Sequence, residues 1–438
     1  MAPRALAQPV YAPSPYAVHG HGAYAHPAQA VGFRERLLLV VLYVTVLASS
    51  VAVIEPSPHD ALMGVLALAC VIAGVRIDRH IALLFILLLA WNAGGLMSLL
   101  NVPGEMKTVQ YAATSVYLAV AALIFACLLA ENTLARISTL RAAYVLTATL
   151  VAAMGTIGYL RLFPGAGDLF AITGRAQGLF KDPNVFGPFL IWPALIVLER
   201  MFLRRIGLLD VIVAAILLLG LLLSFSRGAW LHFTVSCAVM IALAFLTAPR
   251  PSVRVRIFGM TIIGLAALAA FIAIALSFDA VASMFKERFT LVKSYDVGEG
   301  GRFRLQELAL AALLDFPNGM GPFGFSSVHG TQQHNTYLQA FMVYGWIGGV
   351  SYLLLLGATF LMALRTVFVV TPWHPYLIAA LATLVGMAVE GMVIDTDHWR
   401  HFFLMLGMIW GLGAATLKYK RQRHAPIPAA GYGHAGAG

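Results

Sequence analysis

The sequence predicts an all-α protein that crosses a membrane many times. Hydrophobic residues make up 60% of the 438 positions and charged residues only 11%, which excludes an ordinary soluble domain. The apolar runs are about 20 residues long, as a membrane-spanning helix requires, whereas a transmembrane barrel would show alternating segments of about ten residues. Because a backbone in lipid must satisfy its own hydrogen bonds, we expect these runs to be helices.

Twelve candidate spans follow one another along the chain. They cover residues 37–54, 61–75, 81–100, 109–130, 142–163, 185–202, 206–225, 228–248, 257–278, 336–368, 376–394 and 401–417. The tenth is too long for one simple span, so we expect it to begin outside the hydrocarbon. Residues 1–32 and 418–438 are expected to be disordered cytoplasmic tails. One transmembrane domain, residues 33–417, lies between them.

The basic residues predict the orientation. The formal net charge of +10 could reflect nucleic acid, anionic lipid or topology, and the hydropathy favours the last two, so membrane lipids and no nucleic acid are expected as partners. With both termini in the cytoplasm, the Lys and Arg residues of the short loops fall mostly on the cytoplasmic side. The positive-inside rule favours this arrangement, and it places the long 279–335 loop outside.

Three segments on the predicted outer side carry polar motifs. The first is R-A-Q-G-L-F-K-D-P-N over 175–184, and the second is S-F-S-R-G over 224–228. The third begins with Gly301-Arg302, continues through a Gly- and Pro-rich region over 317–324, and ends with His334-Asn335. Outward-facing cations are unusual for topology alone, so these segments are candidates for a functional site.

This ordered set resembles the O-antigen ligase and polymerase superfamily, with R-x-x-G-x-F-x-D-P-N, then S-x-S-R-G, G-R and H-N. The resemblance covers about residues 37–417. It implies about twelve spans with a periplasmic loop between spans 9 and 10, and glycan transfer at the periplasmic face of a Gram-negative inner membrane. The implied donor is an undecaprenyl-diphosphate-linked glycan. A ligase transfers it to a lipid A-core sugar, which we favour, and a polymerase to another carrier-linked repeat.

The residues suit this chemistry. A sugar hydroxyl is a poor nucleophile, and histidine, which titrates near neutral pH, is a natural base for its proton; His334 is the candidate. The diphosphate leaving group needs its charge held, and the planar guanidinium of arginine matches phosphate oxygens. The candidate diphosphate ligands are Arg227, Arg302 and Arg304, with Arg175 and Lys181 at the rim; possible supporting residues are His329, Asn335, Asp395 and Asp397.

One position departs from the family pattern. Members often carry a tryptophan four residues after the G-R arginine, where this chain has Gln306. The alignment there does not choose between Arg302 and Arg304, so both stay candidates. Two further polar residues lie within candidate spans. His232 is expected to be a core histidine. Glu390 either functions within the membrane or makes a structural hydrogen bond.

Three alternatives remain open. Asp395 and Asp397 form a D-x-D pair that would hold a divalent metal in a metal-dependent glycosyltransferase; we expect no metal or cofactor, because the arginines supply the countercharge. A lipid-linked oligosaccharide flippase would also have a cationic cavity but needs no base. A cell-wall polymerase would rely on an acidic residue in the long loop, where Asp296, Glu299 and Glu307 form no recognisable site.

Overall fold

The structure, a computed structural model, describes residues 32–102, 104–203, 206–288 and 301–424. This part is almost entirely helical, and the sheet in it is a single antiparallel pair, β1 (Ala171–Ile172) with β2 (Arg175–Ala176). The predicted all-α class is therefore confirmed. Of the expected tails, residues 1–31 and 425–438 lie outside the described residues. Residues 289–300 of the long loop, which include Asp296 and Glu299, also lie outside them.

The first half of the chain forms helices that cover the first five predicted spans. They are α1 (Phe33–Leu47), η1 (Ala48–Ser50), α2 (Pro58–Ala73), η2 (Arg79–Ile81), α3 (Ala82–Ser98), η3 (Leu99–Asn101), α4 (Met106–Leu129), α5 (Thr133–Leu160) and α6 (Ala166–Phe170). The hairpin of β1 and β2 follows α6 and leads into the rest of the molecule.

The second half begins at the D-P-N turn. Its helices are α7 (Pro183–Phe189), α8 (Ile191–Leu203), α9 (Leu208–Leu223), α10 (Arg227–Thr247), α11 (Pro251–Leu276), α12 (Asp279–Arg288), α14 (Arg302–Ala312), α15 (Gly324–His329), α16 (Thr336–Val367), α17 (His374–Glu390) and α18 (Arg400–His424). α18 extends past the predicted boundary at residue 417, so the helix includes the first residues of the expected C-terminal tail.

Many of these helices suit a bilayer. Among the described residues, eight helices are long and apolar enough to cross a membrane, and three shorter apolar helices accompany them, namely Pro58–Ala73, Leu208–Leu223 and His374–Glu390. A multi-pass membrane protein is therefore supported, while the number of twelve spans stays a prediction.

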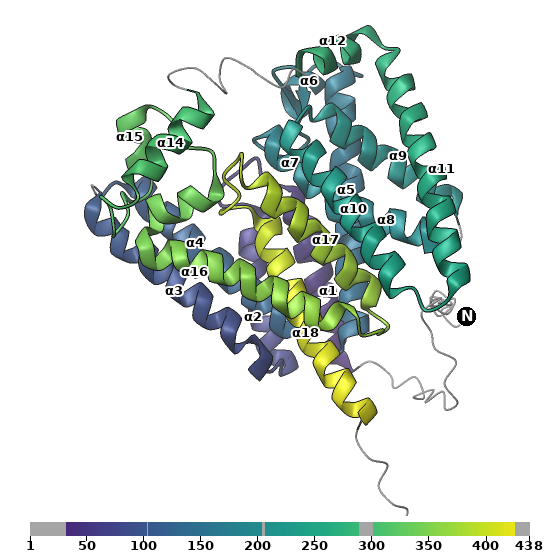
Figure 1. The fold of residues 1–438 in the computed structure, drawn as a ribbon, viewed down its shortest axis with the longest axis horizontal. Coiled ribbons are helices and arrows are strands. Elements are labelled where there is room, and N and C mark those ends of the chain that lie inside the picture. The colour runs from purple at the N-terminus through teal and green to yellow at the C-terminus, as the bar shows by residue number, and fades with distance from the viewer. Residues whose placement is uncertain (1–31, 103, 204–205, 289–300, 425–438) are drawn as a thin grey trace, which may run out of the picture.

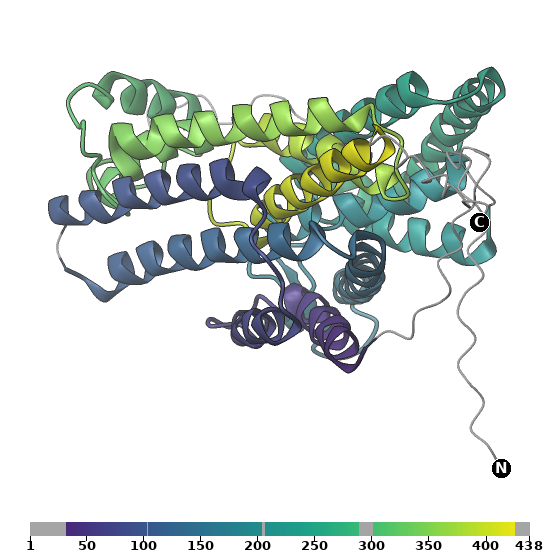
Figure 2. The ribbon, with the colours of Figure 1, turned by 90° about the horizontal axis from the view of Figure 1, so that it is seen from below.

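Close helix pairs build the core. α16 packs along α3, α18 along α4, and α10 along α17, and the pairing of α16 with α3 is visible in Figures 1 and 2. On α18 the close approach depends on glycine: a Cβ atom added at Gly407 or Gly411 would lie 2.6 Å from the carbonyl oxygen of Ala122 or Ala126 on α4. Small residues allow such backbone contact between membrane helices, where dispersion replaces the hydrophobic effect.

Ion pairs between helices agree with the predicted sidedness. Each of the following joins two segments that the sequence places on the same side of the membrane: Arg136 with Glu35 and Lys418 with Asp78 on the predicted cytoplasmic side, and Arg400 with Asp60 and Lys181 with Glu55 on the outer side. The structure therefore supports the predicted grouping of loops. Which side faces the cytoplasm stays a prediction.

The segment predicted as the long outer loop contains three helices in its described part. α12, α14 and α15 lie at the upper edge of Figure 1, opposite the end of α18. The turn between α14 and α15 is joined to α16 at a break in that helix, where Gly345 has φ 65° and ψ −170°. The break frees backbone groups that bind the Gly- and Pro-rich turn: Trp346 N donates to the Pro317 carbonyl at 2.8 Å, and Met320 N donates to the Met342 carbonyl at 2.6 Å.

Candidate active site

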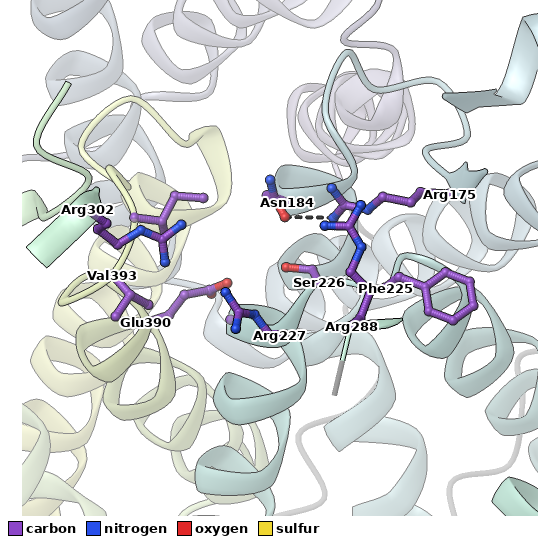
Figure 3. A pocket seen from close by; sticks show the side chains of 11 residues that line it. Arg175, Asn184, Phe225, Ser226, Arg227, Arg288, Arg302, Glu390 and Val393 are labelled. Carbon is purple, nitrogen blue, oxygen red and sulfur yellow. Dashed lines mark hydrogen bonds between the residues drawn. The ribbon is translucent and has the colours of Figure 1, made fainter. Parts of the chain in front are cut away.

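A strongly cationic cavity of ≈ 170 Å³ lies where α7, the α9–α10 junction, α12, α14 and the end of α17 meet. Its lining residues are Arg175, Asn184, Phe225, Ser226, Arg227, Gly228, Arg288, Arg302, Glu390, Val393 and Ile394. Figure 3 shows Arg302, Glu390 and Val393 on one side of the space, and Arg175, Asn184, Arg288 and Phe225 on the other. Guanidinium groups from four separate segments thus surround one cavity.

Arg227 reaches the cavity because the S-F-S-R-G motif separates two apolar helices. Phe225 has a left-handed backbone with φ 46°, so α9 cannot continue into α10. Ser226 then caps α10 by accepting a hydrogen bond from Ala229 N, as a serine commonly does before the first turn of a helix. Arg227 is the first residue of α10. The motif therefore places a cation at a helix junction facing a cavity, and not in a loop at the surface.

Arg175 joins the first motif to the second. Its Nε atom donates to the Ser224 carbonyl at 2.8 Å, and its Nη2 atom donates to Asn184 Oδ1 at 2.7 Å, the bond drawn in Figure 3. Asp182 accepts from Asn184 N at 2.8 Å and caps α7. Arg175 lines the cavity, but these two N–H groups of its guanidinium bind protein groups and hold the two motifs together.

The structure distinguishes between Arg302 and Arg304. Arg302 begins α14 and lines the cavity. Arg304 is two residues further along the same helix, and residues at that spacing point in different directions. Its side chain is 55% exposed and pairs with Glu307 at 3.1 Å. The prediction that left Arg304 open as a diphosphate ligand is therefore not supported by its position.

Two other cations also differ from expectation. Lys181 was predicted at the rim, but it is not among the lining residues and pairs with Glu55 at 3.1 Å. Arg288, which is not among the candidates predicted from the sequence, lines the cavity from the end of α12. No motif marks Arg288 in the sequence, and its only signal is its place among the cations of the long outer segment.

His334 lies beside the cavity, outside its lining. Its Nδ1 atom is 3.6 Å from Oδ2 of Asp395, which follows the cavity-lining Ile394 in the chain. The His334 side chain is 40% exposed, so a substrate can reach it. Burial raises the pKa of the Asp395 carboxyl above its ordinary value, and the contact with His334 only partly offsets this effect.

Asn335 has a structural role in this region. Its side chain accepts hydrogen bonds from Tyr337 N and Leu338 N, which makes it the N-cap of α16. Its backbone N–H donates to Asp395 Oδ1 at 2.9 Å. His334 precedes this cap, outside the helix, with φ 50°.

Gln306, the departure from the family pattern, holds the His334 segment in place. Its Nε2 atom donates to the carbonyl oxygens of His334 and Met392, each at 3.2 Å. Gln306 is one helical turn after Arg302 on α14, so α14 carries both a cavity arginine and a contact to the histidine segment. The sequence marked this position without indicating what it does.

The two aspartates of the D-x-D pair face different partners. Asp395 lies beside His334, whereas Asp397 is 2% exposed and accepts from Tyr111 Oη at 2.7 Å, with His398 Nδ1 at 3.0 Å. Burial would raise the pKa of Asp397, but the charge of His398 and these hydrogen bonds outweigh it and lower the pKa. Among the described residues, no group of three or more His, Cys, Asp or Glu side chains is placed to hold a metal ion.

His329 ends α15 and packs its ring against Phe325, with centroids 4.4 Å apart. It is not among the cavity-lining residues. The structure therefore does not bring His329 together with the arginines.

Glu390 lines the cavity and forms a buried pair with His232. Its Oε2 atom lies 2.8 Å from His232 Nδ1, and His232 Nε2 lies 2.9 Å from the Thr383 carbonyl. Both side chains are fully buried. His232 is a core histidine, as expected, but it also connects the core to the cavity through Glu390.

The sequence profile of the family described as O-antigen ligase matches residues 212–353. Over this segment, about a third of the chain, the protein is similar to the O-antigen ligase family. The matched segment runs from α9 into α16 and carries Arg227, Arg288, Arg302 and His334. The resemblance predicted from the motifs is thereby confirmed. Comparison with curated proteins gives no match for this chain.

The matched segment supplies only part of the site. Arg175, Glu390 and Asp395 lie outside it and complete the cavity and the surroundings of His334. The family implies O-antigen ligase or polymerase activity, and hence an enzyme of the glycosyl-transfer type that acts on lipid-linked glycans in membranes.

Proposed function

We propose that this protein is an inverting O-antigen ligase. It transfers a glycan from an undecaprenyl-diphosphate carrier to a sugar hydroxyl of lipid A-core, at the periplasmic face of a Gram-negative inner membrane. The observation that carries the proposal is the convergence of Arg175, Arg227, Arg288 and Arg302 on one cavity beside His334. A diphosphate is the group in such a donor that needs several cations at once.

The arginines hold the leaving group. Arg227, Arg288 and Arg302 bind the oxygens of the diphosphate, while Arg175 keeps the two motifs in register through Ser224 and Asn184. As the bond between the sugar carbon and the phosphate oxygen breaks, its electron pair passes to the diphosphate. Preorganised donors of this kind contribute about 3–4 kcal/mol each to transition-state stabilisation, so the arginines suffice as countercharge without a metal.

His334 acts as the general base. It takes the proton from the acceptor hydroxyl as the oxygen attacks the anomeric carbon from the face opposite the diphosphate, which inverts the configuration. Asp395 stabilises the imidazolium that forms, from 3.6 Å. Gln306 and Asn335 fix the backbone on either side of this exchange. The base therefore approaches from the exposed side, where an acceptor can enter.

A polymerase would use the same donor and the same base with a different acceptor, and a flippase would need no transfer at all. Purified protein in lipid nanodiscs, given an undecaprenyl-diphosphate-linked glycan with and without lipid A-core, separates the three functions. We expect glycan on lipid A-core, unchanged by EDTA. Elongated carrier-linked glycan would favour the polymerase. No product with either acceptor would favour transport, and loss in EDTA restored by magnesium would assign Asp395 and Asp397 to a metal.

A further inference from the structure

Glu390 is the one carboxylate among the described residues that line the arginine cavity. Its side chain is fully buried. Oε2 is engaged by His232, but Oε1 has no hydrogen-bond partner among the described residues. A pair that served only to hold α10 against α17 would engage both oxygens within the protein, because an unsatisfied buried acceptor is costly. Oε1 therefore points to a group that the cavity receives.

The hydrogen bonds of His232 determine what Oε1 can do. The Thr383 carbonyl can only accept, so His232 Nε2 carries a proton. The 2.8 Å contact between Nδ1 and Oε2 then holds one proton, on either atom. A further proton on Oε1 would add positive charge beside four guanidinium groups, which repulsion between like charges disfavours. Oε1 is thus an acceptor, and its ligand must be a donor.

Gly228 lies directly against the Glu390 carboxylate, at the wall of the cavity. A Cβ atom at this position would lie 2.8 Å from Oε1 and 3.3 Å from Glu390 Cγ, closer than real Cβ contacts allow. Gly228 is in the first turn of α10, where alanine would favour the helix more. The glycine of the S-R-G motif therefore lets the Glu390 carboxylate lie against the first turn of α10, at the cavity wall.

A diphosphate alone does not satisfy this arrangement. At neutral pH its oxygens accept hydrogen bonds, which suits the arginines but not Oε1. The sugar attached to it carries hydroxyl or amide N–H donors next to the bond that breaks. We propose that Glu390 recognises a hydroxyl or acetamido N–H of the sugar directly linked to the diphosphate. This inference rests on the proposed function, and it makes Glu390 a specificity-determining residue for the donor.

Two probes test the proposal: undecaprenyl diphosphate, and the same lipid carrying one N-acetylglucosamine on its diphosphate. Their affinities are measured for the full-length protein in nanodiscs. In Glu390→Met, we expect the affinity for the sugar-bearing probe to fall about 10- to 100-fold, because a hydrogen bond to a charged group is lost. The affinity for the sugar-free probe should change less than about two-fold. Glu390→Gln should lose less than Glu390→Met, because its amide can bond His232 Nδ1 and keep an oxygen toward the sugar.

Gly228→Ala provides a second variant that retains both Glu390 and His232 and places a methyl group against Oε1. It should show the same selective loss for the sugar-bearing probe.

Equal losses for both probes in Glu390→Met and Gly228→Ala, or no loss for either probe, would overturn the inference. Arg227→Ala should weaken both probes alike. If the wild-type protein binds neither probe, the proposed function fails and the inference fails with it; if only the sugar selectivity is missing, the inference alone fails.

Discussion

The Nδ1 atom of His334 lies 3.6 Å from Oδ2 of Asp395, across the junction between the start of α16 and the loop that follows α17. The other oxygen of this carboxylate accepts the Asn335 N–H. One carboxylate therefore fixes the backbone next to the proposed base and faces its imidazole. Positions so far apart in the sequence show no pattern that links them.

Asp395→Asn should slow transfer at neutral pH about 10-fold or more while donor affinity stays nearly unchanged, because the amide keeps the bond to Asn335 N but cannot stabilise an imidazolium. Burial raises the pKa of Asp395, so the wild-type carboxylate is lost on acidification at a higher pH than for an ordinary aspartate. The variant, which has no carboxylate to lose there, should retain a larger share of its own activity. Rates across mildly acidic pH check this; identical pH profiles would contradict it.

Arg288 and Arg304 should respond oppositely to truncation. Arg288→Ala removes a cavity guanidinium, so donor affinity should fall about 10- to 100-fold, as expected for a lost charge-assisted bond. Arg304→Ala breaks only an exposed pair with Glu307, and such pairs contribute about 0–1 kcal/mol, so donor affinity should stay within about two-fold. Donor titrations of the two variants at matched protein levels measure both effects. A larger loss in Arg304→Ala would mean that the cavity is not where the diphosphate binds.

Gln306→Ala should lower turnover more than donor affinity. The substitution removes the donor that holds the carbonyl groups of His334 and Met392, so the base loses its fixed position while the arginines remain in place. We expect a loss of about 10-fold in turnover, since misplacement of a catalytic group by about 1 Å can cost 10²-fold. Glu307→Ala on the same helix, whose side chain is 68% exposed, is the matched control. Equal turnover in the two variants would remove Gln306 from the site.

The predicted orientation can be checked by cysteine labelling. In a variant without Cys70, Cys127 and Cys237, a single cysteine at Ser327 should react with a membrane-impermeant maleimide in intact spheroplasts. A single cysteine at Ser252 should react only after lysis. Both serines are exposed, so access to the reagent depends on the side of the membrane. Labelling of both positions from the same side would contradict the topology.

The features that could be predicted from the sequence are those determined by residues close together in the chain. Apolar runs of membrane length predicted the helices, and the motifs located Arg175, Arg227 and the Gly301-Arg302 pair. The choice between Arg302 and Arg304 needed the phase of α14, which fixes which of the two faces the cavity. The motif alone does not distinguish the two arginines, because Gln306 interrupts the family pattern there.

Other features depend on contacts between distant segments. Arg288 belongs to no motif and joins the site only because α12 ends beside the α9–α10 junction. The sequence pairs Asp395 with Asp397 as neighbours, but the fold directs one to His334 and the other to Tyr111. Glu390 was left with two interpretations, because the bond to His232 joins two helices whose packing is not encoded locally. Such relationships follow from tertiary packing, which one sequence does not display.

The most direct measurement compares donor affinity and turnover, side by side, for the wild-type protein, His334→Ala and Arg227→Lys in nanodiscs. His334→Ala should lower turnover by about 10² to 10⁴-fold, the usual contribution of a general base, and leave the affinity for the undecaprenyl-diphosphate-linked glycan nearly intact. Arg227→Lys should weaken donor binding and slow transfer together, because lysine keeps the charge but loses the planar fork. Normal transfer by His334→Ala, or unchanged donor affinity in Arg227→Lys, would contradict the division of roles between the base and the arginine cavity.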